Sequence, residues 1–485
     1  MGVKMKKTWL SYLLWLLFTA QSLVLSAVYF SAADMFFGKS GEYAAVILAC
    51  LLFAAAVCIW FLGHKAAGIW TGKLLEEEHA KKMLECFLVM CLFAAAILYR
   101  IQLRRMSVPE ISKYYDMATI KSTGGVPEIA HGASYCYTVI LSAVLSFSGN
   151  RAAAGVLLQI VLQLLSLLLL YFGVKQLTGR IEALCAMAVM AFWPVYASHI
   201  YYLTPESFYF FLYVLGLLGI GLCRKANEEK GRKKERYAGL LLAGIYTGVM
   251  GYLDILGWTL LFFSIGICMG ESVEGEKGAG KSVVWQILFC LLGSLAGFLG
   301  CMAMDAGASG SSLWEIWETW TDAVPLSGVF RFPSAPGGSL AAGTVLCFCS
   351  MLGAVGFWFH REQKQDMWIL YLLAATVLDM ASAGTFTYKI FIASGWAVLA
   401  GIGINSMRKC GKSKKALKVT VPDIVLEDMD RIEEETDGKP KVQLIENPLP
   451  LPKKHVRREM EYDRIVEYDK MKFDIEVDET DDFDI

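Results

Sequence analysis

The sequence predicts an all-α fold, a polytopic bundle of about twelve transmembrane helices. Of its 485 residues, 56% are hydrophobic and only 19% are charged, and the mean hydropathy is +0.47. The apolar residues gather in runs long enough to cross a bilayer, which takes about 20 helical residues. A soluble core could not bury so many runs of this length, so the composition excludes an ordinary soluble enzyme.

The twelve predicted spans follow from the apolar windows. Nine windows are long enough to cross singly, at 9–32, 43–63, 83–99, 152–174, 182–200, 205–223, 282–303, 338–359 and 386–406. The stretch 237–270 predicts two short helices that break near Asp254, and 367–382 predicts one more.

Basic residues predict the orientation of these spans. The loop 224–236 holds seven Lys and Arg, and a basic cluster follows the last span, so both should be cytoplasmic, as should residues 1–7. The remaining apolar run, 134–148, fits this topology only as an interfacial or re-entrant helix on the outer side. Both termini are then cytoplasmic, and 99–151 and 304–337 become outer loops.

Three parts are expected along the chain. Residues 1–82 form two extra N-terminal spans with a cytoplasmic loop, 83–406 form the transmembrane core, and 407–485 form a largely disordered tail. Residues 421–485 carry a net charge of −11 against +10 for the rest. Such an acidic tail is typical of a solvated appendage that docks a cytoplasmic partner, and the chain offers no nucleic-acid surface.

The outer loop 99–151 carries the first candidate chemistry. Glu110 and Asp116 lie six residues apart, and a carboxylate can take a proton from an attacking hydroxyl or hold a metal ion. Two exposed acids on a surface loop are the alternative. Arg100, Arg104 and Arg105 stand on the outer side against the charge rule, either as snorkelling side chains or as a phosphate site.

Ionisable residues inside or at the ends of spans form a second group. A charge in mid-membrane costs about 2.5–3.5 kcal/mol on insertion scales, so such residues indicate function or a span boundary. They are His199, Glu206, Asp254, Asp379 and Lys389.

Two further motifs leave alternatives open. Trp314, Trp317 and Trp320 in the loop 304–337 could stack on sugar rings or anchor the loop at the bilayer boundary. The segment 275–282 matches the phosphate-loop pattern, but there is no room for the soluble parallel sheet that this motif requires, so we interpret the match as coincidence.

Residues 109–222 resemble the bacterial GT-C membrane glycosyltransferases related to protein O-mannosyltransferases and aminoarabinose transferases (glycosyltransferase family 39-like). The resemblance lies in the order of short segments along the chain. These are Pro109-Glu110, Tyr115-Asp116, His131 to Tyr135, Gly149-Asn150-Arg151, Lys175 to Arg180, Trp193-Pro194 and Pro205-Glu206.

The resemblance implies that a sugar is moved from a polyprenyl-phosphate carrier to a cell-surface acceptor, on the outer face of a bacterial plasma membrane. In the family the first acid of a pair is the catalytic base. This chain has Pro109 there, so either Glu110 or Asp116 substitutes, or the chain is a degenerate member. Our hypothesis for the substrate pocket places Tyr115, Arg104, Arg105, His131, Glu206, Asp254 and Lys389 around the substrate. Of these, Lys389 stands where the resemblance implies a cation for the lipid phosphate.

Two readings from other classes stay open. A catalytically degenerate scaffold would work through its tail, and a lipid or solute transporter would use a broken helix such as the one expected at Asp254. The sequence identifies no cofactor with certainty, and a divalent metal ion is left open. The sugar, the acceptor and the oligomeric state do not follow from the sequence.

Overall fold

The computed structural model describes residues 9–32, 41–70, 78–106, 112–125, 133–230, 233–272, 279–323, 340–359, 363–381 and 386–416. These residues belong to one compact unit, Thr8–Leu417. Glu110, His131 and residues 417–485 of the predicted cytoplasmic tail lie outside the described residues, whereas residues 407–416 belong to the last helix.

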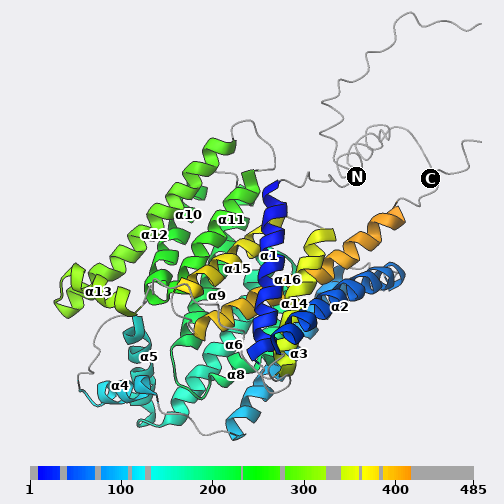
Figure 1. Ribbon diagram of the computed structural model, residues 1–485. Helices are drawn as coiled ribbons and strands as arrows, with labels where there is room; N and C mark the ends of the chain where they lie inside the picture. The colour runs from blue at the N-terminus through cyan, green and yellow to red at the C-terminus, as the bar shows by residue number, and fades with distance from the viewer. Residues whose placement is uncertain are drawn as a thin grey trace, which may run out of the picture. The chain divides into compact units, whose positions relative to one another are not determined.

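Every regular element among the described residues is a helix, which confirms the predicted all-α class (Figure 1). The elements are α1 (Trp9–Ala32), α2 (Gly41–Trp70), α3 (Glu78–Met106), α4 (Lys113–Ser122), α5 (Ala133–Ser148), α6 (Ala152–Leu177), α7 (Arg180–Phe192), α8 (Pro194–Ser198), α9 (Glu206–Lys230), α10 (Lys233–Leu253), the 3₁₀ helix η2 (Ile255–Trp258), α11 (Thr259–Ser272), α12 (Ala279–Ser309), α13 (Leu313–Ala323), α14 (Leu340–Phe359), α15 (Gln363–Ala381) and α16 (Phe386–Ala416).

Seven helices in the described part of the chain are long and apolar enough to cross a membrane. These candidate spans are Tyr12–Ser31, Ala44–Lys65, Lys82–Arg105, Ala152–Leu177, Glu206–Arg224, Val284–Ser309 and Lys389–Met407. Shorter apolar helices occur at Tyr135–Ser148, Tyr237–Leu253, Ile255–Gly266 and Gly343–Phe359. The chain is therefore a multi-pass helical protein by length and composition, and the count of about twelve crossings stays a prediction.

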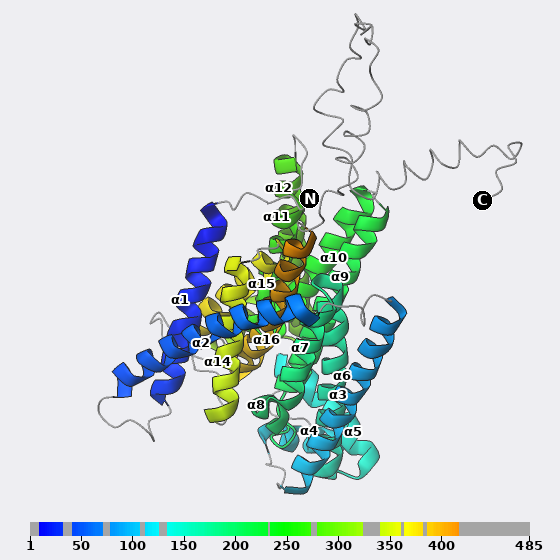
Figure 2. The same cartoon turned by 90° about the vertical axis from the view of Figure 1, so that its right-hand side faces the viewer.

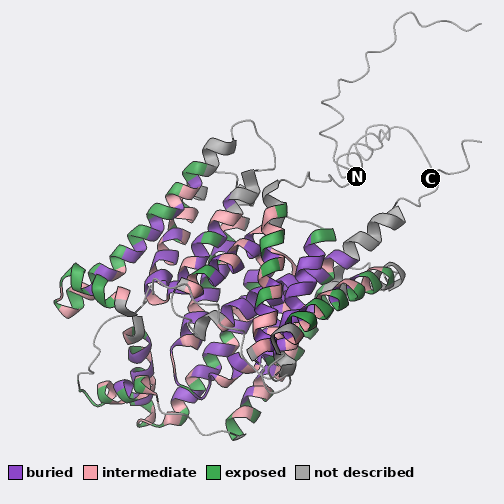
Figure 3. Cartoon of the chain, viewed as in Figure 1, coloured by how far each residue is buried: buried purple, intermediate pink, exposed green. Residues whose placement is uncertain are grey.

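The last long helix, α16, forms the centre of the bundle. Of its candidate span, 89% is buried, whereas only 17% of the span in α3 is buried. It packs against α14, α7 and α2, and in Figure 2 it runs between α14 and α7. Figure 3 shows the same contrast in burial between the centre of the bundle and its outer helices.

Helices α10 and α12 approach each other through glycines. A Cβ atom at Gly248 would lie 2.0 Å from the carbonyl oxygen of Ser294, and one at Gly297 would lie 2.1 Å from that of Ile245. Each glycine is one of two spaced four residues apart on its helix, with Gly244 and Gly293 as the partners. This small-residue spacing lets two helix backbones pack directly against each other inside a membrane.

The two extra N-terminal helices pack on the C-terminal part of the bundle. Trp15 in α1 donates its indole N–H to the carbonyl oxygen of Ala354 at 3.0 Å, and Trp60 in α2 donates to the hydroxyl of Ser406 at 2.8 Å. Buried indoles need such acceptors, so these bonds give α1 and α2 defined positions on α14 and α16.

Two breaks in the helices position the polar groups. The break expected near Asp254 is present, because α10 ends at Leu253 and η2 separates it from α11. The predicted span 182–200 is wrong as a single helix, because α7 ends at Phe192 and Pro194 begins the short helix α8. Proline cannot donate the backbone hydrogen bond that would continue a helix.

Candidate functional site

An irregular segment between α7 and α9, residues 193–205, carries the candidate site. Trp193 has an extended backbone because a proline follows it, and Leu203 adopts a left-handed backbone with φ 47°. The segment is nonetheless inside the protein, since Tyr196, Ile200 and Leu203 are fully buried. Buried carbonyls outside a regular helix must find donors elsewhere, because an unpaired one is costly.

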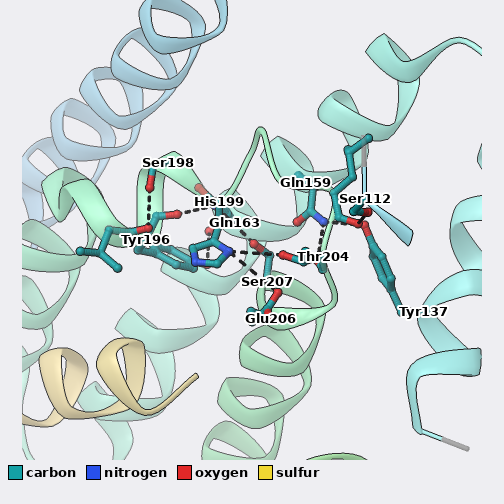
Figure 4. A network of polar contacts seen from close by, with 12 residues as sticks. Ser112, Tyr137, Gln159, Gln163, Tyr196, Ser198, His199, Thr204, Glu206 and Ser207 are labelled. Atoms are coloured by element: carbon teal, nitrogen blue, oxygen red, sulfur yellow. Dashed lines mark hydrogen bonds and ion pairs between the residues drawn. The ribbon is translucent and has the colours of Figure 1, made fainter. Parts of the chain in front are cut away.

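Side chains from the neighbouring helices supply those donors (Figure 4). Gln163 Nε2 donates to the carbonyl oxygen of Tyr196 at 2.6 Å, and Gln159 Nε2 donates to that of Thr204 at 2.8 Å. Because these glutamines lie four residues apart on α6, they share one face of that helix. The path of the segment is therefore fixed by amides from a neighbouring span.

Arg100 supports the same segment from α3. Its guanidinium is fully buried and donates to Gln163 Oε1 at 2.8 Å and to the carbonyl oxygens of Ala191 at 3.0 Å and Ala96 at 3.3 Å. Besides these acceptors the guanidinium lies over the ring of Tyr196, whose centroid is 5.7 Å away, and its contacts in the described part of the chain include no carboxylate. The snorkelling interpretation is therefore wrong for Arg100, whose head group is in the interior.

His199 and Glu206 meet at the end of this segment. His199 is 3% exposed, and its Nδ1 lies 3.9 Å from Glu206 Oε2 and 3.5 Å from the hydroxyl of Thr204. Lys389 at the start of the α16 span is within electrostatic range of His199, and Asp254 is within electrostatic range of Glu206. His199 and Glu206 are thus close neighbours at one end of the bundle, and Lys389 and Asp254 each act electrostatically on one of the two.

Burial determines the charge of His199. The residue lies between α8 and α9, outside the seven candidate spans, and burial together with the positive charge of Lys389 lowers its pKa to about 3. At neutral pH the imidazole is therefore uncharged, and its contact with Glu206 is not a pair of opposite charges. An uncharged imidazole donates one hydrogen bond through one ring nitrogen and accepts one through the other.

Asp254 has a local structural role as well. Its carboxylate accepts the backbone N–H of Leu256 at 2.8 Å and thereby caps η2. This is the preferred use of an aspartate at a helix start. The break in the α10–α11 region is thus stabilised by the same residue that lies beside Glu206.

The other predicted site residues whose positions are described lie on α3 and α4. Asp116 is exposed on α4, and Arg104 and Arg105 are exposed in the last turn of α3. Tyr115 donates its hydroxyl to the carbonyl oxygen of Asn150 at 2.7 Å. Helix α4 touches the segment through Ser112, whose hydroxyl donates to the carbonyl oxygen of Leu203 at 3.0 Å.

Sequence reasoning missed Gln159 and Gln163 as determinants of the site, and it noted Arg100 only as a snorkelling or phosphate-binding residue. The available signal was two amides four residues apart inside an otherwise apolar span. A search for metal ligands finds no group of three or more His, Cys, Asp or Glu in the described residues.

Comparisons with known proteins give structural neighbours only. No family model and no curated protein matches the chain. An archaeal oligosaccharyltransferase, AglB from Archaeoglobus fulgidus in complex with an inhibitory peptide and a dolichol-phosphate, is similar with a TM-score of 0.46 and 13% identity, over 74% of this chain and 53% of that one. A structure of the oligosaccharyltransferase from the same organism, tethered with an acceptor peptide containing the NVT sequon, has a TM-score of 0.43 and 13% identity, over 78% and 61%.

The chain thus spans between about half and three fifths of the length of these neighbours. At 13% identity and TM-scores below 0.5, these similarities assign neither a family nor site residues to this chain.

Proposed function

We propose that the chain is a membrane glycosyltransferase that moves a sugar from a polyprenyl-phosphate carrier to a cell-surface acceptor. The observation that carries the proposal is the cluster of His199, Glu206, Asp254 and Lys389 at one end of a bundle of apolar helices. Ionisable groups gathered at such a position are expensive and indicate function. A prenyl chain would lie in the bilayer while its phosphate reached the cluster.

The cations in this proposal hold the phosphate. Lys389 is only partly exposed and stands at the start of the α16 span, while Arg104 and Arg105 are exposed at the end of α3. Charge-assisted hydrogen bonds to phosphate oxygens are about twice as strong as neutral ones. Negative charge grows on the leaving phosphate during transfer, and a fixed cation stabilises that charge.

A carboxylate completes the reaction. The acceptor oxygen forms a bond to the anomeric carbon while the carboxylate accepts the hydroxyl proton. The bond from that carbon to the phosphate oxygen breaks, and polyprenyl phosphate leaves with the electron pair. Asp116 and Glu110 are the expected bases, and Glu206 is a third candidate because its carboxylate is largely buried beside His199. Tyr115, His131 and Asp254 line the pocket.

The test is a turnover assay of the full chain in lipid nanodiscs with a polyprenyl-phosphate sugar, using water and hydroxylated compounds as acceptors. Asp116→Asn, Glu110→Gln and Glu206→Gln are compared with Glu318→Gln, an exposed acid on α13. Loss of the true base should lower turnover by about 10²–10⁴-fold. Equal turnover in all variants would remove the assignment of a base.

Assays of the wild type, together with a deletion of the tail, decide between the function classes. Absence of any sugar transfer would contradict the transferase. Movement of the intact lipid or of a solute across the bilayer would then indicate the transporter. Loss of a cellular phenotype on deletion of residues 421–485, with the membrane region intact, would indicate the scaffold.

Topology is tested separately. We propose that the site faces outward and that both termini are cytoplasmic, because the basic loops are expected inside. Cysteines introduced at 110 and 116 should then react with a membrane-impermeant maleimide on intact cells, and a cysteine in the loop 224–236 should not. The reverse pattern would overturn this orientation.

A further inference from the structure

Helix α13 presents three different faces. Ile316 is buried, and with Trp320 it packs on Phe298 and Tyr252. Glu315 and Glu318 are exposed on the opposite side. Between these faces, Leu313, Trp314 and Trp317 are 54%, 67% and 39% exposed and cover an arc of about 100°. Leu313 and Trp314 are thus mostly uncovered by the described residues, and Trp317 exposes part of its ring while stacking on Trp320 with the centroids 5.7 Å apart.

This apolar face continues the outer side of α12. Only 33% of the candidate span in α12 is buried, and Leu292, Leu295 and Leu299 on it are all about half exposed. Helix α13 starts directly after α12, beyond a turn at Gly310, whose φ of 70° is the left-handed conformation that ends many helices. Figure 1 shows α13 at the end of α12, and Figure 3 shows exposed residues on both.

Trp314 is oriented as an interfacial residue. Its indole N–H donates to Glu318 Oε1 at 2.6 Å, toward the acidic face, while its ring stays exposed. A tryptophan with an apolar ring and a hydrogen-bonded polar edge is suited to the level of the lipid headgroups. The chemistry of the face therefore matches a lipid boundary better than a dry protein interface.

The helix is held on the end of α10. Trp320 donates its indole N–H to the carbonyl oxygen of Tyr252 at 3.1 Å, and the Tyr252 hydroxyl hydrogen-bonds Asp305 of α12. Tyr252 lies in the last turn of α10, where carbonyls lack a partner within the helix. It is two residues before Asp254, so α13 is tied to the turn that reaches the candidate site.

We propose that α13 is a lipid-binding helix that lies in the membrane interface, with Leu313, Trp314 and Trp317 inserted among phospholipids. The inserted face continues the lipid-facing side of α12, and the Trp320–Tyr252 bond fixes the turn before Asp254 at the membrane boundary. This role is independent of the proposed transferase activity.

The test uses tryptophan fluorescence of the full chain in phosphatidylcholine nanodiscs. Subtracting the emission spectrum of Trp314→Phe from that of the wild type gives the emission of Trp314. The same subtraction with Trp396→Phe gives the emission of a fully buried reference tryptophan. Lipids brominated near the ester groups should quench the Trp314 signal roughly twofold, and more than lipids brominated near the chain ends. The Trp396 signal should change little.

Two results would overturn the proposal. The first is a Trp314 signal that neither brominated lipid quenches, because the ring would then be in water, on a sugar or under a protein. The second is a cross-link between copies of the chain through a photoreactive residue at 314, because a second copy would then cover the face. Trp314→Phe keeps a large apolar ring at an exposed position, so a monodisperse size-exclusion profile is the folding control.

Discussion

The two ends of the helices α3, α6 and α7 accommodate cations in opposite ways. At one end, Lys175 Nζ lies 2.5 Å from Glu85 Oε1 and Arg180 Nε lies 3.2 Å from Glu85 Oε2. At the other end, the buried guanidinium of Arg100 bonds an amide and two carbonyl oxygens. The first arrangement pairs opposite charges, and the second uses a buried charge to bond the last turn of α7 and to orient Gln163, which in turn bonds the irregular segment.

The two ends differ in whether a cation can move into water when its partner is removed. The side chains of Lys175 and Arg180 are 34% and 39% exposed and can relax toward water, so pairs of this kind contribute little. Arg100 is fully buried and has no such alternative. Mutational effects should therefore be larger at the Arg100 end, where the segment 193–205 depends on its donors.

The largest effect is expected for Arg100→Leu. The carbonyl oxygen of Ala191 and Oε1 of Gln163 both lose a donor, and each unsatisfied buried acceptor costs about 1–3 kcal/mol. The free energy of unfolding should fall by about 2–4 kcal/mol, measured by thermal or denaturant unfolding in the same nanodisc lipid. A variant more stable than wild type would show that desolvation of the guanidinium dominates, as happens for some buried ions.

An intermediate effect is expected for Gln163→Leu. The carbonyl oxygen of Tyr196 loses its donor and Arg100 loses one acceptor, so the free energy of unfolding should fall by about 1–3 kcal/mol. Gln102→Leu, at an exposed position of α3, is the matched control and should change stability little. Equal stabilities of the two variants would mean that the amide does not support the segment.

A smaller effect is expected for Glu85→Gln. It leaves Lys175 and Arg180 without their shared carboxylate, but both side chains are over a third exposed, so the loss should be about 1 kcal/mol or less. Salt screens such pairs, so raising the ionic strength should shrink the difference between variant and wild type. If Glu85→Gln lowered the free energy of unfolding more than Arg100→Leu does, the expected difference between the two ends would be contradicted.

The smallest effect at neutral pH is expected at His199. Its pKa in the folded protein, about 3, lies below the usual 6.5, so the unfolded chain binds more protons in between. The contribution of His199 to the free energy of unfolding is therefore fully present above pH 6.5, and it is lost as the pH falls toward 3. Melting temperatures across this range should fall less steeply for His199→Gln than for wild type. Identical slopes would contradict a buried, uncharged imidazole.

Much of the fold follows from the sequence because length and apolarity define membrane helices directly. The first predicted span, 9–32, has the bounds of α1, and the break at Asp254 is present. The span 182–200 failed because a buried irregular segment is as apolar as a helix. Hydropathy averaged over a window does not register the helix break that a single residue, Pro194, causes.

The candidate site was predictable only where charge was involved. Glu206, Asp254 and Lys389 stood out because ionised groups are expensive in apolar spans. Gln159 and Gln163 did not, because neutral amides are cheaper and their carbonyl partners lie on other helices. Such pairings depend on how helices pack, which periodicity along one chain does not encode.

The most direct measurement of the central claim is the binding of polyprenyl phosphate to the intact chain. Affinity is compared between wild type, Lys389→Met and Lys113→Met, an exposed lysine on α4. A phosphate held beside His199 and Glu206 predicts that only Lys389→Met weakens binding, by roughly tenfold or more. Unchanged affinity in Lys389→Met, or equal losses in both variants, would contradict the placement of the lipid phosphate at this end of the bundle.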